Sequence, residues 1–90
     1  MNEDRIKLAA EYCKIAGEAD EDLVFTLCYD AAIEYAENAG VPEPEEKSAA
    51  YDLLICMLTS TWYDNRGSMI VGQVPNKLER TVSSLVLSLR

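Results

Sequence analysis

The stretch that decides the fold runs from Glu46 to Gly67 and reads EKSAAYDLLICMLTSTWYDNRG. It contains the densest apolar block of the chain, Leu53 to Leu58, and the single tryptophan, Trp62. Its apolar residues recur at helical spacing on two adjacent stripes, which predicts a helix that is covered on more than one side. The stripes are Ala50, Leu53, Leu54, Met57, Leu58 and Thr61, and beside them Tyr51, Ile55, Leu58 and Trp62. We expect this helix to be the centre of a small helical domain.

A first helix is predicted over Asp4 to Ile15. Leu8, Tyr12 and Ile15 fall on one face at i, i+4, i+7 spacing. Gly17 is expected to end this helix, because glycine readily takes the left-handed conformation that closes helices.

A second helix is predicted from an N-cap at Asp20 to Ala39, with Gly40 as its stop. Its apolar stripe is Val24, Cys28, Ala31, Ala32, Tyr35 and Ala39, and its acidic face is Asp30, Glu34 and Glu37. Leu23 and Leu27 fall beside the acidic face and outside the apolar stripe. Either a third helix covers these two leucines, which is the more common outcome, or they contact another subunit.

The connections on both sides of the central helix have different characters. The sequence from Val41 to Pro44 breaks the second helix, and Pro44 could take the first position of the next one. Residues 67–75 are predicted to form a non-helical loop or arm, because two glycines bracket Met69, Ile70 and Val71. These three apolar residues either plug the core or pack on a partner.

A last helix opens at Asn76, where Glu79 three residues later completes a capping-box pattern. Its apolar stripe is Leu78, Val82, Leu85, Val86 and Leu89. Leu87 stands on the opposite, serine-rich face and is a weak candidate for a contact with another molecule. The predicted fold is therefore all-α, a small bundle of about four helices with short connections.

Ninety residues are enough for one small domain, and we treat residues 1–90 as a single one. Residues 1–46 carry thirteen acids and three bases, a net charge of −10, whereas residues 47–90 carry three acids and five bases, a net charge of +2. The negative charge of residues 1–46 argues against a nucleic-acid-binding function, because phosphate binding requires clusters of lysine and arginine. The split indicates either simple solubility or complementary surfaces that attract neighbouring copies head to tail.

Catalytic and metal-binding patterns are not found in the sequence. The chain has no histidine, so the usual base of a serine or cysteine triad is missing. Cys13, Cys28 and Cys56 stand singly among apolar residues without a C-x-x-C pair, and we interpret them as buried thiols of a reduced, cytosolic protein. The first residues do not have the pattern of a signal peptide, and no apolar run reaches the length of a membrane span. We expect no enzyme, no cofactor, no metal and no membrane contact.

The end of the central helix allows two interpretations. Asp64, Asn65 and Arg66 could solvate a helix terminus, where Arg66 suits the negative pole of the helix dipole. Alternatively, Trp62, Tyr63 and Arg66 belong to the residue types that are enriched in binding hot spots, which favours a contact with a subunit or partner.

Three segments of the chain resemble the small head–tail connector proteins of tailed bacteriophages, a family also described as DNA-packaging proteins. The first is the acid-capped second helix, from Asp20-Glu21-Asp22-Leu23 through Ala31-Ala32 to Tyr35. The second is the apolar third helix that ends in Trp62-Tyr63-Asp64-Asn65-Arg66. The third is Val74-Pro75 followed by a leucine-rich helix that ends in Arg90. The segments occur in the family's order over nearly the whole chain, although the alanine- and cysteine-rich first helix departs from the family's pattern.

The resemblance implies a structural protein of the virion, made in the cytoplasm of the bacterial host. Members of the family form a homo-oligomeric ring, a dodecamer on the portal protein, which extends the DNA channel and docks the next connector or a tail protein. DNA passes through the channel without specific binding. The resemblance thus implies an adaptor at the head–tail junction of a phage or prophage. The candidate contact residues are Leu23, Leu27, Trp62, Tyr63, Arg66, Met69, Ile70, Val71 and Leu87.

The rival hypothesis is a small acidic helical binding module, antitoxin-like or anti-repressor-like, which occupies a basic surface of its partner. The net charge of −8 fits this function as well. The position of the gene separates the two hypotheses, since a connector gene lies between portal or capsid genes and tail genes.

Overall fold

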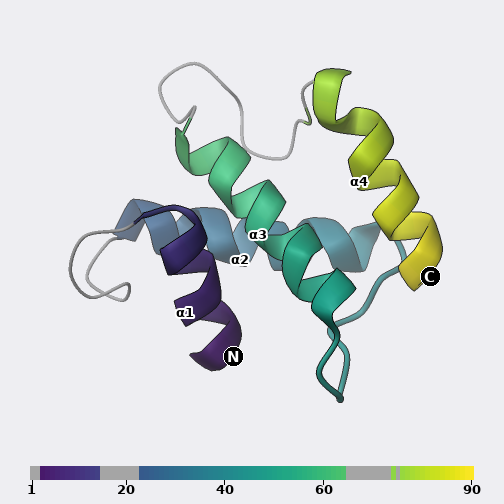
Figure 1. Cartoon of the computed structure of the whole chain (residues 1–90), viewed down its shortest axis with the longest axis horizontal. Helices are drawn as coiled ribbons and strands as arrows, with labels where there is room; N and C mark the ends of the chain where they lie inside the picture. The colour runs from purple at the N-terminus through teal and green to yellow at the C-terminus, as the bar shows by residue number, and fades with distance from the viewer. Residues whose placement is uncertain (1–2, 15–22, 65–73, 75) are drawn as a thin grey trace.

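The computed structural model describes residues 3–14, 23–64, 74 and 76–90, which contain four helices (Figure 1). The helices are α1 (Glu3–Tyr12), α2 (Leu23–Asn38), α3 (Ala49–Asp64) and α4 (Asn76–Leu89). No strand occurs among the described residues, so the predicted all-α bundle is confirmed. Apart from Val74, which lies outside the helices, the predicted loop at 67–75 falls outside the described residues.

Helix α3 is the centre of the fold, as the sequence predicts. It packs against α1, α2 and α4, and Figure 1 shows it crossing α2 with α1 on one side and α4 on the other. Half of its sixteen residues are buried: Tyr51, Asp52, Leu54, Ile55, Cys56, Leu58, Thr59 and Trp62. The stripe that begins at Tyr51 is therefore buried throughout, whereas Leu53 of the other predicted stripe is nearly half exposed. The molecule is flat, 18 Å thick against 33 and 31 Å, so the helices keep large outward faces.

The start of α3 is set by Ser48, not by Pro44. The Ser48 side-chain oxygen accepts a hydrogen bond from the Tyr51 backbone N–H at 3.2 Å, and its carbonyl accepts one from Asp52 at 3.0 Å. This is the N-cap arrangement, in which a serine satisfies a backbone donor of the first turn. The expectation that Pro44 opens the helix is wrong, because the cap lies four residues later.

Aromatic packing joins α2 to the end of α3. The Trp62 ring meets the Tyr35 ring edge-on, with 5.9 Å between centroids, and Tyr63 meets Phe25 edge-on at 6.1 Å. Edge-to-face pairs of this kind add to the free energy gained from burying the rings. The last turn of α3 is thus held in place by two rings of α2.

The buried face of α2 is rotated from the predicted stripe. Phe25, Cys28, Tyr29, Ala32 and Ala36 are buried. Of the predicted stripe, Val24 is nearly half exposed instead. The rotation has a simple cause. Turning the rings of Phe25 and Tyr29 inward removes more apolar area from water than burying Val24 does.

Gly40 ends α2 as predicted. It has φ of +92°, and its N–H donates to the Glu37 carbonyl at 3.0 Å. The Val41 N–H donates to the Ala36 carbonyl at 2.8 Å, which completes a Schellman motif. Val41 and Ala36 are both buried, so this helix end is capped and packed at once.

Helix α1 ends three residues earlier than predicted, at Tyr12. Lys14 takes the left-handed conformation with φ of +58°, and its N–H donates to the Glu11 carbonyl at 3.1 Å. The predicted stripe is also wrong, because Leu8 and Tyr12 are about half exposed whereas Arg5 and Ala9 are buried. The ion pairs of Arg5, described below, explain why this face turns inward. The expected stop at Gly17 lies outside the described residues.

Helix α4 begins at Asn76 and has the predicted orientation. Val82 is buried, and Leu85, Val86 and Leu89 pack half-buried against the core. Leu87 lies on the opposite face and is 69% exposed. Helix α4 is therefore an amphipathic helix at the edge of the molecule (Figure 1).

Candidate functional site

The outward side of α2 is the most unusual surface of the described chain. We call Leu23, Leu27, Asp30, Glu34 and Glu37 the α2 outer face, because spacings of three and four residues place them on one side of a helix. All five are exposed, and Leu23 and Leu27 reach 79% and 65%. The expectation that a third helix covers the two leucines is wrong, because α3 packs on the opposite, buried side of α2. Two leucines followed by three acids form a surface that suits an apolar and basic partner.

The other predicted contact residues fall into three groups. Leu87 is exposed on α4, and Tyr63 is half-buried against Phe25. Trp62 is 1% exposed, so in this fold it packs in the core. The remaining candidates lie outside the described residues: Arg66, Met69, Ile70 and Val71.

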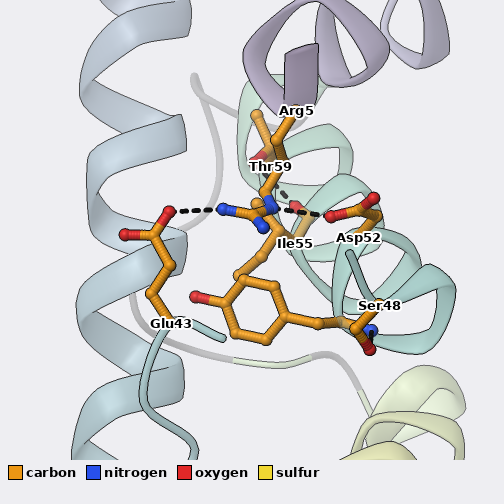
Figure 2. Close-up of polar contacts among 7 residues, drawn as sticks. Arg5, Glu43, Ser48, Asp52, Ile55 and Thr59 are labelled. Atoms are coloured by element: carbon orange, nitrogen blue, oxygen red, sulfur yellow. Dashed lines mark hydrogen bonds and ion pairs between the residues drawn. The ribbon is translucent and has the colours of Figure 1, made fainter. Parts of the chain in front are cut away.

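A buried arginine joins α1, α3 and the connection between α2 and α3 (Figure 2). The Arg5 Nε donates to the Asp52 Oδ1 at 2.6 Å, and Nη1 donates to the Glu43 carboxylate. The guanidinium also lies over the Tyr51 ring, with Cζ 4.7 Å from the centroid. The Arg5 side chain is 2% exposed and that of Asp52 is 12% exposed. Ions this well buried are tolerated when they are paired and hydrogen-bonded.

We call Arg5, Glu43, Tyr51 and Asp52 the Arg5 centre. The electrostatics of this centre keep Arg5 charged. Burial lowers the pKa of Arg5, but the hydrogen bond and charge of Asp52, together with smaller contributions from Tyr29 and Glu43, outweigh it and raise the pKa above its ordinary value. An arginine that cannot lose its proton neither donates nor accepts one in a reaction. The centre therefore acts as a structural clamp.

Two buried tyrosine hydroxyls accompany the arginine. Neither the Tyr29 nor the Tyr51 hydroxyl makes a hydrogen bond of ordinary geometry to a described residue. Burial raises the pKa of Tyr51 to about 12 and also raises that of Tyr29, although Arg5 lies near enough to Tyr29 to lower it in part. Both hydroxyls therefore stay neutral at physiological pH.

The sequence interpretation missed this centre. Arg5 is separated from Glu43 by 38 positions and from Asp52 by 47, so no local pattern joins them. The available signal was Asp52, a single carboxylate at the start of the densest apolar block. A charge in such a position requires a partner of opposite sign.

Two shallow clefts border the Arg5 centre. One of about 250 Å³ is lined by Asp4, Arg5, Leu8, Pro44, Glu45, Glu46, Lys47 and Asp52. The other, of about 160 Å³, is lined by Tyr29, Asp30, Ile33 and Glu43. Both are smaller than the roughly 300–1,000 Å³ of typical small-molecule sites. The clefts do not favour a ligand-binding function.

The cysteines do not have the properties of nucleophiles. Cys28 and Cys56 are buried thiols, as predicted, and Cys13 is half-buried. Burial is the main cause that raises the pKa of Cys13 to about 12 and that of Cys56 to about 11, which disfavours the reactive thiolate. Within the described part of the chain, no group of three or more His, Cys, Asp or Glu could hold a metal ion.

None of the described helices is both long and apolar enough to cross a bilayer. A comparison of the chain with protein-family models, with curated proteins and with solved structures finds no match.

Proposed function

We propose that the chain is a structural subunit of the head–tail connector of a tailed bacteriophage or prophage. In this role it forms a ring under the portal protein, extends the DNA channel and offers a platform to the next connector or to a tail protein. The three segments that resemble the connector family support the proposal, as does the all-helical fold around α3.

The observation that carries the proposal is the α2 outer face. A 90-residue chain has few apolar residues to spare for its surface, yet Leu23 and Leu27 are largely exposed. Exposed leucines bordered by charged residues are typical of surfaces that other proteins cover. A subunit that becomes stable in an assembly needs such a surface.

A structural role also fits the chemistry of the interior. The Arg5 centre joins α1, α3 and the connection between α2 and α3 through an arginine whose pKa is raised, and the two clefts beside it are small. We therefore propose an assembly function without catalysis.

The acidic surface suits a wall along which DNA slides. Acids repel phosphates, so a channel lined by them holds no DNA in place by counter-ion release. Outside the α2 outer face, Glu11, Glu45 and Glu46 are exposed and supply such charges.

The test is assembly on the portal. The purified chain is mixed with the portal protein encoded in the same phage or prophage region, and negative-stain images and light scattering follow the complex. A ring of this chain at the narrow end of the portal is the expected result. A chain that stays monomeric with the portal present would contradict the proposal.

The acidic binding module remains the second candidate, and the acids of the α2 outer face favour it as well. It predicts a small complex of fixed stoichiometry with a basic protein, in place of a ring. A gene beside a toxin or regulator gene, together with a one-to-one complex, would decide for this candidate.

A further inference from the structure

We infer that the α2 outer face of one copy docks antiparallel on the outward face of α4 in the next copy. The inference rests on the proposed function, because it names the contact through which neighbouring subunits of the ring join. The exposure, charge and spacing of residues on the two helices support it.

The α4 outer face consists of Arg80, Ser83, Ser84 and Leu87, all of which are exposed. Spacings of three, four and seven residues place these residues on one side of the helix, opposite the apolar stripe that packs on the core. Glu79, another exposed charge, lies about 100° from Arg80 around the helix axis. The α4 outer face thus presents a leucine and a cation, whereas the α2 outer face presents leucines and anions.

The spacing of the two faces matches. Leu27 and Glu34 are seven residues apart on α2, and so are Arg80 and Leu87 on α4. Each pair spans two turns, roughly 10.5 Å at the rise of an α-helix. Both pairs can therefore meet across one helix–helix contact.

The order of the residues selects the antiparallel arrangement. With the helices antiparallel, Leu27 faces Leu87 and Glu34 faces Arg80, while Asp30 faces the hydroxyl of Ser84. With the helices parallel, each leucine would face a charge, which would bury apolar and ionic groups against one another without hydrogen bonds. The antiparallel register therefore pairs leucine with leucine and an acid with a base.

A second copy of the chain is the occupant that this geometry specifies. Two α2 outer faces packed in parallel would bring acids against acids, and packed antiparallel about Asp30 they would bring leucines against acids and Asp30 against Asp30, so both arrangements are unfavourable. Because the two surfaces differ, the contact is heterologous, and repeating it from copy to copy closes a ring or extends a filament. This is the kind of interface that a connector ring requires.

Cysteine cross-linking tests the contact directly. Leu27→Cys and Leu87→Cys variants of the full chain are purified separately, mixed and oxidised, with one variant isotopically labelled so that mass spectrometry identifies the pair. We expect a cross-link between the two introduced thiols in the mixture and none in either variant alone. The control pairs Leu8→Cys, an exposed leucine of α1, with Leu87→Cys and yields no cross-link.

Charge reversal tests the proposed ion pair. Glu34→Arg and Arg80→Glu should each raise the dissociation constant for self-association about tenfold, a loss of about 1.4 kcal/mol of association free energy, because an attraction is replaced by a repulsion. The double variant carries the pair in swapped order and should return to the dissociation constant of the native chain. Glu11→Arg, the same charge change on an exposed position of α1, should leave the dissociation constant unchanged. Sedimentation velocity measures all four.

The outcomes separate this inference from the proposed function. Rings on the portal without the cross-link overturn the α2–α4 contact and leave the connector function standing. The cross-link without binding to the portal supports the contact and overturns the connector function. Cross-linking within either single variant, or no rescue in the double variant, overturns the heterologous pairing.

Discussion

The Arg5 centre and the α2 outer face reverse the usual distribution of residues in a small protein. Inside, Arg5 and Asp52 place charges where apolar side chains are expected, and Tyr51 covers the guanidinium with its ring. Outside, Leu23 and Leu27 place large apolar side chains in water. Each region is unusual for the opposite reason.

Ion pairing acts in the interior of this chain, whereas uncovered apolar surface lies on its outside. The buried ion pair contributes little net stability relative to an apolar core, but it fixes geometry, because any departure leaves a charge without its counter-ion. Leucines exposed to this degree contribute little to the stability of the isolated chain, and their burial becomes favourable where another surface covers them. One region specifies the fold, and the other would specify the proposed assembly.

The largest effect is expected when the buried pair loses one member. Asp52→Ala leaves the Arg5 charge buried with Glu43 as its remaining ionic partner, and should lower the free energy of unfolding by about 3–5 kcal/mol. Urea denaturation monitored by circular dichroism measures the change. Glu43→Gln is the matched control and should cost only about 1 kcal/mol, because the Glu43 side chain is 38% exposed and its interaction is screened.

A double variant sharpens the first prediction. Arg5→Met together with Asp52→Leu removes both charges and fills the space with apolar groups, so it should be more stable than Asp52→Ala alone. A double variant that is less stable than Asp52→Ala would show that the Arg5–Asp52 pair contributes net stability as well as fixing the geometry.

The same leucine-to-alanine substitution should have a large effect in the core and a small effect on the α2 outer face. Leu54→Ala removes a fully buried side chain of α3 and should lower the free energy of unfolding by about 2–4 kcal/mol. Leu27→Ala removes the same atoms from an exposed position and should change it by less than about 0.5 kcal/mol. Thermal and urea unfolding of dilute protein provides the measurement. A large loss in Leu27→Ala would mean that this leucine already stabilises the single chain.

Among the buried positions, the smallest effect at neutral pH is expected for Tyr51 of the Arg5 centre. The Tyr51 hydroxyl has no hydrogen-bond partner of ordinary geometry among the described residues, so Tyr51→Phe should change the free energy of unfolding by less than about 1 kcal/mol.

At alkaline pH the same variant should differ more clearly from the native chain. The pKa of Tyr51 rises from 10.0 to about 12 on folding, so between these values the unfolded chain releases a proton that the folded chain retains. Stability is therefore full below pH 10 for this group and falls as pH rises toward 12. Tyr51→Phe should reduce that fall in a pH series of urea denaturations. Cys13, whose pKa rises from 9.0 to about 12, adds a loss that starts near pH 9 and persists in the variant.

Much of the fold follows from local patterns in the sequence. The central role of α3 is evident from the apolar residues between Leu53 and Trp62, and the end of α2 from Gly40, which adopts the positive φ that favours glycine. The start of α4 at Asn76 and its buried stripe also follow from residues close in sequence. The exposed leucines of the α2 outer face could be suspected, because they share a side of the helix with acids.

What could not be predicted depends on contacts between distant residues. The rotation of α1 follows from the pairing of Arg5 with Asp52 and Glu43, which lie in other parts of the chain. The end of α1 at Tyr12 requires a lysine, Lys14, in a conformation that lysine rarely takes, so glycine appeared to be the better stop. Trp62 packs in the core against the ring of Tyr35, which lies 27 positions earlier in the sequence. Tryptophan is also typical of binding surfaces, so its residue type alone did not predict this position.

The place of α4 at the edge of the bundle has a consequence for local unfolding. Only Val82 of its described residues is buried, and its packing is mainly against α3. A helix with so little buried apolar surface opens at a lower free energy than the centre of the fold, so its amide hydrogens should exchange with solvent before those of α3. Assembly through the α4 outer face would suppress this opening. The exchange rate of the α4 amides would therefore report, residue by residue, when a neighbouring subunit has docked.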